Sequence, residues 1–239
     1  MFRAEFSVAP IDSFTLAGPE GKHAASVRRM RVGEAIQLSN GLGGRIRGKI
    51  SAVRQGEVDI EVASCSQDLA PKLQLTLVQA LAKGDRDELA VQAATELGIS
   101  RVIPWQAEHS ISRWEGAKIA NSVQRWQAIV AEAAKQSMQT FEPKVSNPLS
   151  TKQLIGDASL TGRRFVLDPT ASAGLASVGS LVGEVSLVVG PEGGISGSEL
   201  HDFEAAGFER VHLGSSILRT STAGVAAVAA ICALSGIWN

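Results

Sequence analysis

The sequence predicts an α/β protein with a mostly parallel sheet, preceded by a small β-rich unit. Three observations carry this prediction. From residue 73 onward, short apolar segments alternate with longer segments of helical spacing, as in a sheet covered by helices. Residues 1–70 instead show the two-residue alternation of strands. A polar stretch at 66–72 separates the two patterns, so we expect domains at 1–70 and 71–239.

The first domain contains three candidate strands, at 3–8, 45–50 and 58–62, each with alternating residue character. Segment 19–30 has helical character, and a Gly-rich turn at 39–44 precedes the second strand. Because successive side chains point to opposite faces of a strand, 45–50 presents three basic residues on one face. They are Arg45, Arg47 and Lys49.

The second domain begins with a near-continuous apolar run at 73–81, which is typical of a buried central strand. Ser196 and Glu199 form a capping-box pattern that begins a helix ending near Gly207. Further strands are predicted at 101–105, 164–167, 186–189 and 211–213. Further helices are predicted at 85–97, 117–138 and 220–234.

Composition excludes several classes of protein. The chain has 239 residues, a net charge of −1 and two cysteines that form no CxxC pair. Every apolar run is shorter than the roughly 18 residues of a membrane span, and the first residues lack the order of a signal peptide. We therefore expect a cytoplasmic protein with reduced thiols and no membrane contact. No cluster has metal-ligand spacing, so no metal is expected.

Segment 187–196, LVVGPEGGIS, places a Gly-rich loop directly after an apolar strand. Glycine lets the backbone approach a ligand closely, and the amides and carbonyls at a strand end suit a nucleoside. The alternative that the residues leave open is a tight strand-to-helix turn. The segment lacks the Gly-Lys-Ser/Thr and GxGxxG patterns, which disfavours phosphate binding.

Segment 213–223, LGSSILRTSTA, is a second loop of this kind, and its hydroxyl residues are suited to cap the last helix. Arg219 stands at the positively polarised start of that helix, where a cation is mildly unfavourable. This placement favours an anionic or polar partner for Arg219. A salt bridge to a nearby carboxylate is the alternative.

Together the two segments resemble the RsmE-like 16S ribosomal RNA uridine-N3 methyltransferases. Segments 23–33 (HAASVRRMRVG), 88–98 (ELAVQAATELG) and 125–136 (RWQAIVAEAAKQ) follow the family's order, as does Pro143. The resemblance therefore covers nearly the whole chain. It implies a PUA-like β-barrel, a SPOUT domain with a deep C-terminal trefoil knot, and a homodimer with active sites near its interface.

The resemblance also implies that the cofactor is S-adenosylmethionine and that the substrate is a uridine of 16S ribosomal RNA in the assembled small subunit. Backbone groups of the knot loops would hold the adenine and ribose, and Leu and Ile side chains would sandwich the ring. The corresponding residues here are Leu167, Asp168, Gly190, Pro191, Glu192, Gly193, Gly194, Leu213, Gly214, Ile217 and Leu218.

Methylation at N3 leaves negative charge on the uracil oxygens, and Arg219 is the candidate catalytic residue that stabilises it. The sequence identifies no general base. His109 and His212 could accept a proton near neutral pH and are candidates for the base. Glu192 is a further candidate, but a structural role in which it bonds backbone amides fits it equally well. RNA phosphates would contact basic residues of the first domain, for which a solvated charged face is the alternative. These residues are Arg28, Arg29, Arg31, Arg45, Arg47 and Lys49.

Three positions depart from the usual family pattern. His109 stands where many members have Arg. Gln139 lies in segment 136–140, which lacks the arginines that members often have after the residue corresponding to Gln136. Ser216 belongs to the pair 215–216, which replaces a Pro-containing pair. Fewer fixed charges predict weaker RNA binding. Two other functions stay open: a SPOUT enzyme that methylates a ribose 2′-hydroxyl, and a catalytically silent RNA-binding factor in ribosome assembly.

Overall fold

The computed structural model describes residues 1–238, which form two compact units. The N-terminal unit comprises Met1–Ala70 and Ala134–Glu142, and the C-terminal unit contains the remaining residues. The boundary at Ala70 lies inside the predicted polar stretch. Segment 134–142 differs from the predicted division, which placed it in the second domain.

Long-range polar contacts explain why segment 134–142 joins the N-terminal unit. The Thr140 hydroxyl donates to Asp68 at 2.7 Å, and the Thr140 carbonyl accepts from the Gly43 amide at 2.9 Å. Lys135 also forms an ion pair with Glu20 at 2.6 Å. Sequence spacing does not reveal contacts of this kind, because their partners lie far apart along the chain.

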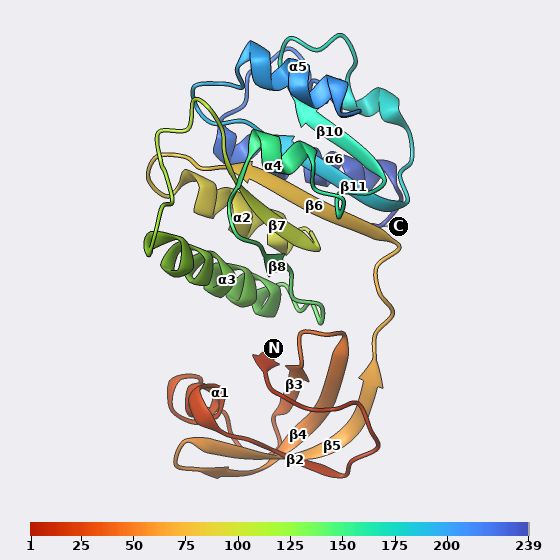
Figure 1. The fold of residues 1–239 in the computed structure, drawn as a ribbon. Helices are drawn as coiled ribbons and strands as arrows, with labels where there is room; N and C mark the ends of the chain where they lie inside the picture. The colour runs from red at the N-terminus through yellow and green to blue at the C-terminus, as the bar shows by residue number, and fades with distance from the viewer. Residues whose placement is uncertain (239) are drawn as a thin grey trace. The chain divides into compact units, whose positions relative to one another are not determined.

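The N-terminal unit contains one five-stranded sheet, which curls as Figure 1 shows. Its two long central strands are antiparallel and shift register between Arg47 and Gly48 and again between Ile50 and Ala52. Such bulges bend a strand and increase its twist, which suits a PUA-like half-barrel. The order of the strands is β1 (Phe2–Arg3), β3 (Ala35–Ser39), β4 (Gly44–Arg54), β5 (Glu57–Gln67) and β2 (Ser13–Leu16).

One helix of the N-terminal unit is shorter than predicted. Helix α1 spans Gly18–Lys22 and continues into a single π-helical turn at His23–Val27, where 19–30 was expected. Arg29 has a φ of 51°, which ends the right-handed helical path.

The C-terminal unit contains a seven-stranded sheet in which every strand pair is parallel. The predicted α/β class with a mostly parallel sheet is therefore confirmed. The two-residue strands at 144–145 and 149–150 were not predicted, because they are short and each lies next to a proline, which is unfavourable in a strand. The order is β12 (Glu209–Val211), β10 (Arg163–Leu167), β11 (Gly183–Val189), β6 (Leu73–Ala80), β7 (Arg101–Gln106) and β8 (Lys144–Val145), and β9 (Leu149–Ser150) also pairs with β7.

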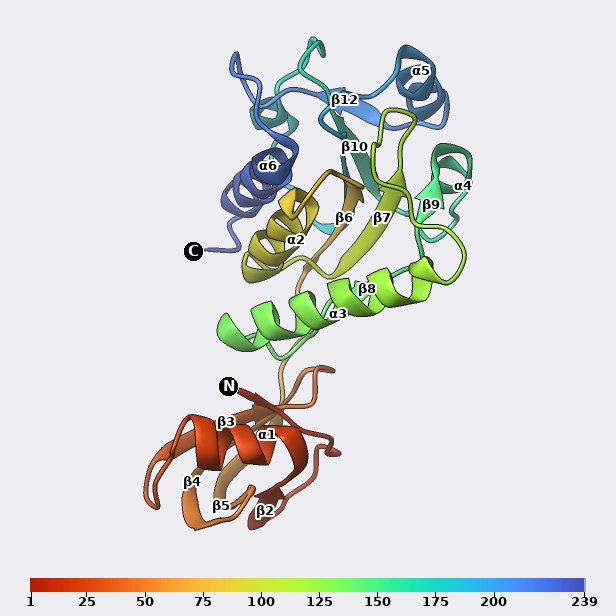
Figure 2. The ribbon, with the colours of Figure 1, turned by 90° about the vertical axis from the view of Figure 1, so that its left-hand side faces the viewer.

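Helices cover both faces of this sheet, as Figure 2 shows. In β6, Leu77 and Val78 point to opposite faces and join different apolar clusters. The Leu77 face packs on α2 (Arg86–Glu96), α3 (Lys118–Gln136) and α6 (Thr220–Leu234). The Val78 face packs on α4 (Thr151–Ile155) and α5 (Gly197–Ala205).

The strand arrangement brings three loops to one edge of the sheet. Because β10, β11 and β12 are parallel neighbours, the loops that follow them start from the same side. The loop after β10 also bridges to the loop after β12 through Gly174 and His212. The trefoil knot that the resemblance implies stays a prediction. Within residues 1–238, no helix combines the length and apolar character that crossing a membrane requires.

Candidate functional site

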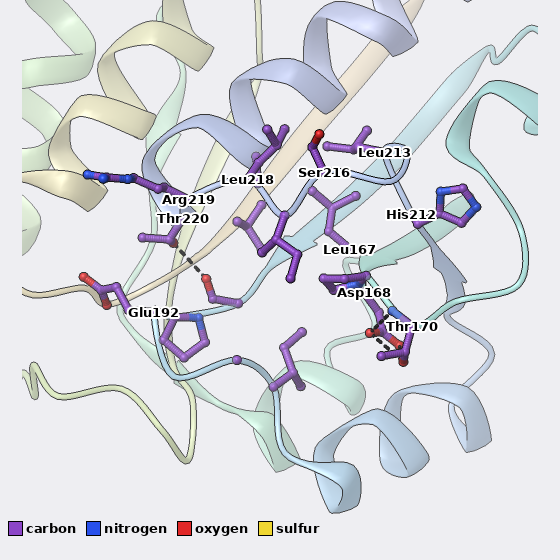
Figure 3. Close-up of a pocket in the computed structure, with 18 of the residues that line it drawn as sticks. Leu167, Asp168, Thr170, Glu192, His212, Leu213, Ser216, Leu218, Arg219 and Thr220 are labelled. Carbon is purple, nitrogen blue, oxygen red and sulfur yellow. Dashed lines mark hydrogen bonds between the residues drawn. The ribbon is translucent and has the colours of Figure 1, made fainter.

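A pocket of about 600 Å³ lies where the loops after β10, β11 and β12 meet (Figure 3). This volume falls within the roughly 300–1,000 Å³ of sites for small molecules and cofactors. Each predicted cofactor residue except Gly193 lines it. The structure therefore brings together two segments, 187–196 and 213–223, that the sequence singled out separately.

Apolar side chains form much of the pocket lining. Leu167 comes from the end of β10, and Leu213 and Ile217 come from the loop after β12. Ile217 is 82% exposed, and Leu218 is also exposed, although both face a concave surface. Apolar groups left uncovered in a cavity favour a flat apolar ligand, such as a heteroaromatic ring.

Gly193 is absent from the pocket lining, although both its neighbours belong to it, and its role as a cofactor residue stays a prediction. A Cβ atom at Gly193 would lie 3.0 Å from the Cβ of His109, which faces it across the loop. Gly193 therefore permits close packing between two loops. The glycine that the pocket itself requires is Gly194, because its φ of 77° disfavours other residues.

Glu192 links the loop after β11 to the start of α2. Its Oε1 accepts from the Arg86 guanidinium at 3.0 Å and from the Lys83 amide at 3.2 Å. Burial alone would raise the pKa of Glu192, but its own backbone amide, Arg86 and Lys83 outweigh burial and lower the pKa. The carboxylate therefore stays ionised and bonds an amide, which is the structural role considered from the sequence.

Asp168 is buried at the opposite end of the pocket (Figure 3). It accepts from the Arg210 Nε at 2.7 Å and from the Thr170 amide and hydroxyl at 2.9 Å each. Burial would raise the pKa of Asp168, but the Thr170 and Arg210 hydrogen bonds prevail and lower it. Asp168 thus shapes the loop after β10 while its carboxylate is already engaged.

Arg219 is the N-cap residue of α6 and one of the residues that line the pocket, while its exposed side chain extends away from the other lining residues in Figure 3. Among residues 1–238 this guanidinium makes no hydrogen bond or ion pair, so the predicted alternative of a salt bridge is not found there. The expected hydroxyl cap of α6 is wrong, because no side chain accepts at this end. The Thr222 hydroxyl instead donates to the Arg219 carbonyl at 3.1 Å.

The two candidate histidines differ in which ring atom is engaged. The Nδ1 of His212 accepts from the Gly214 amide at 3.0 Å, so the neutral ring carries its proton on Nε2. The Nδ1 of His109 faces the carbonyls of Gly193 and Gly194 at 3.2 Å, so there it donates. His212 lines the pocket and His109 lies behind loop 190–196.

Sequence reasoning missed several residues that line the pocket. Their chain neighbours signalled two of them, because Thr220 follows Arg219 and Ile195 follows Gly194. Arg86 gave no local signal, since only the parallel sheet brings the start of α2 beside the loop after β11. No group of His, Cys, Asp and Glu within the described chain is arranged to hold a metal ion.

The predicted RNA-contacting residues all lie in the N-terminal unit, and one of them is already engaged. Arg45 is half-buried and donates to Asp68 at 2.7 Å and to Gln37 at 3.0 Å. The hydrogen bond from Arg45 is the main reason that the pKa of Asp68 is lowered. Arg45 therefore has a structural role in the N-terminal unit, and its contact with RNA stays a prediction. The exposed ones are Arg28, Arg29, Arg31, Arg47 and Lys49.

Two family models match the chain. Residues 69–232 match an RNA methyltransferase domain, and residues 16–63 match an RNA methyltransferase PUA domain. The chain is 36% identical to the ribosomal RNA small subunit methyltransferase E of Mycobacterium tuberculosis, over 93% of this chain and 87% of the relative.

Two solved structures share the whole fold. A ribosomal RNA small subunit methyltransferase E from Neisseria gonorrhoeae, bound to S-adenosyl methionine, is 27% identical, with a TM-score of 0.83 and 98% of each chain covered. A Legionella pneumophila protein in complex with the cofactor SAM is 27% identical, with a TM-score of 0.86 and 97% and 96% covered. Together with the family models, these matches show that the chain belongs to the ribosomal RNA small subunit methyltransferase E family.

Proposed function

We propose that this chain transfers the methyl group of S-adenosylmethionine to N3 of a uridine in 16S ribosomal RNA. The observation that carries the proposal is an apolar, Gly-rich pocket whose lining includes Arg219, an exposed residue whose guanidinium has no partner among residues 1–238. The names of its relatives, and the S-adenosyl methionine bound to the Neisseria protein, support the same reaction.

The residues present fit S-adenosylmethionine. Leu167, Leu213 and Leu218 would flank the adenine ring, and the backbone of Gly190 and Gly214 would face its polar atoms and the ribose. The Asp168 and Glu192 carboxylates are engaged with Arg210 and Arg86, so the apolar side chains and the loop backbone are the groups left to bind the adenosine part of the cofactor.

Bound S-adenosylmethionine would supply an already activated methyl group, so the chain's part is orientation and electrostatics. Asp168 and Glu192 both have lowered pKa values, which makes them weak proton acceptors. Stabilising the uracil anion that results would favour loss of the N3 proton. Arg219 is the described pocket cation without a carboxylate partner, and it would donate to that anion.

The N-terminal unit would hold the RNA backbone through its exposed cations, which supply affinity without sequence information. A second copy of the chain would cover α6. This helix carries no charged residue, and Val225, Ala226 and Ala229 are each half-exposed on it. A helix that is apolar on all sides is usually buried, which supports the homodimer that the resemblance implies. We place the reaction in the cytoplasm, where ribosomal subunits assemble.

Transfer of a labelled methyl group to ribosomal subunits tests the substrate. Small subunits, large subunits and transfer RNA, each from cells that lack this enzyme, are incubated separately with the protein and labelled S-adenosylmethionine. Label in 16S RNA of the small subunit, and none in the large subunit, is expected. Label confined to the large subunit or to transfer RNA would contradict the proposed substrate, and cofactor binding without any transfer would favour a silent RNA-binding factor.

A further inference from the structure

Gln79 places an amide in the middle of the buried sheet. It is 0% exposed in β6, opposite Val189 of β11 and Pro104 of β7. Its neighbours in the layer beneath α6 are otherwise apolar or small, such as Leu77 and Gly224. A buried amide is unfavourable unless its polar atoms are hydrogen-bonded, so its partners indicate why it is present.

The amide nitrogen of Gln79 has two partners. It donates to the Ala80 carbonyl at 3.2 Å and to the Thr220 hydroxyl at 2.9 Å. Because a carbonyl can only accept, the contact with Ala80 fixes which end of the amide is the nitrogen. The Thr220 hydroxyl therefore accepts from Gln79 and must send its own proton elsewhere.

That proton goes to the cofactor loop. The Thr220 hydroxyl donates to the Gly190 carbonyl at 2.8 Å, and both residues line the pocket (Figure 3). Ile195 packs closely against Gly190, because a Cβ atom at position 190 would lie only 2.7 Å from Cγ1 of Ile195. A directed hydrogen-bond chain thus runs from Gln79 through Thr220 to the first residue of loop 190–196.

Only the nitrogen of the Gln79 side-chain amide is hydrogen-bonded. The Gln79 Oε1 has no hydrogen-bond partner within residues 1–238. An unsatisfied buried acceptor costs about 1–3 kcal/mol, whereas an apolar side chain of the same length carries no such cost. Stability alone therefore does not favour Gln at this position.

We propose that Gln79 is a positioning residue for the cofactor: through the Thr220 hydroxyl it holds the Gly190 carbonyl and fixes the start of loop 190–196. The inference rests on the proposed function, because S-adenosylmethionine is the ligand of this loop. The Arg219 carbonyl accepts from the Ala223 amide at 2.8 Å within α6, a bond that does not involve Gln79. Loss of the Gln79 amide should therefore lower cofactor affinity more than the rate of methyl transfer.

Calorimetric titration with S-adenosylmethionine tests this inference, together with thermal unfolding and kcat at saturating cofactor. Gln79→Met keeps the length of the side chain and removes the donor, and Thr220→Val keeps the shape and removes the hydroxyl. Each is expected to raise the Kd about tenfold. For Gln79→Met, whose side chain lies outside the pocket lining, kcat should stay within about twofold and the melting temperature should not fall. Thr220→Ser keeps the hydroxyl and should restore wild-type affinity.

The double variant Gln79→Met/Thr220→Val decides whether the two residues act as one chain. Because either change breaks the same chain, its Kd should rise about tenfold and not the roughly hundredfold of independent effects. Gln74→Met is the matched control in the same strand, because Gln74 lies outside the pocket lining and donates to the Pro71 carbonyl, and it should bind like the wild type. Wild-type affinity in both single variants, a hundredfold loss in the double, or no rescue by Thr220→Ser would overturn the inference. A wild-type protein that binds no S-adenosylmethionine would instead contradict the proposed function.

Discussion

Arg86 and Glu192 lie 106 residues apart and form an ion pair of 3.0 Å that joins the start of α2 to the loop after β11. The same carboxylate oxygen accepts from the Lys83 amide. The Glu192 carboxylate therefore has two roles: it forms an ion pair with Arg86, and it accepts a hydrogen bond from the Lys83 backbone amide. The two roles can be separated by substitution.

Glu192→Gln should weaken cofactor binding only slightly, and Glu192→Ala more strongly. The Gln variant keeps an acceptor for the Lys83 amide and loses an ion pair whose Arg86 side is half-exposed, which is worth about 0–1 kcal/mol. The Ala variant also leaves the amide without its acceptor. Calorimetry should give Kd increases of up to about fivefold for Gln and more for Ala. Identical losses in the two variants would show that the acceptor role is unimportant.

Arg219→Ala should lower kcat by about 100-fold or more with little change in the Kd for S-adenosylmethionine. The guanidinium has no partner among the described residues, and its proposed role is to stabilise the reacting uracil. Because a cation at a helix N-terminus is mildly unfavourable, the variant should be at least as stable as the wild type. Single-turnover kinetics and thermal unfolding measure both effects. Parallel losses in kcat, affinity and stability would identify Arg219 as a structural residue.

Asp87 should make the stability of the C-terminal unit fall as the pH rises from about 4 to about 6. Burial raises the pKa of Asp87 to about 6, although the amides of Ala82 and Glu88 donate to it. The unfolded chain releases this proton at lower pH than the folded chain, so the group destabilises the fold above its folded pKa and not below its unfolded one. Urea unfolding at several pH values measures this slope.

Asp87→Asn is the control for that measurement, because it removes the ionisation and keeps the size. The stability difference between the variant and the wild type should grow in favour of the variant as the pH rises through the same window. A difference that is constant with pH would show that Asp87 has an ordinary pKa.

Arg45→Ala and Arg47→Ala should act on different properties, although the residues are two positions apart in β4. Arg45 is paired with Asp68, so its loss should destabilise the N-terminal unit. Arg47 is exposed, so its loss should weaken RNA binding and reduce the salt dependence of that binding, with stability unchanged. Filter binding at several salt concentrations and thermal unfolding separate the two. If Arg47→Ala leaves the RNA affinity unchanged, Arg47 is an ordinary solvated surface residue and does not contact RNA.

The parallel sheet could be predicted from sequence because buried strands leave continuous apolar runs and helices leave their own spacing. The strand expected at 211–213 shows where this reasoning fails. Strand β12 ends at Val211, and Leu213 turns into the pocket lining. An apolar residue that faces a ligand site has the same sequence signature as one in a strand, so the end of the strand could not be located.

The two loops of the site could also be predicted, because each follows an apolar strand and contains unusual residues. Their partners could not. Gln79 and Thr220 lie 141 residues apart, and the sheet register and the start of α6 bring them together. The close approach of His109 to Gly193 could not be predicted for the same reason, since the two residues belong to distant loops.

The identity of the methylated nucleoside tests the central claim most directly. Small subunits from cells that lack the enzyme are treated with the protein and S-adenosylmethionine, and their 16S RNA is digested to nucleosides and analysed by mass spectrometry. The account predicts 3-methyluridine, formed by the wild type and nearly absent with Arg219→Ala. A 2′-O-methylated nucleoside in its place would contradict the account, because ribose methylation creates no uracil anion for Arg219 to stabilise.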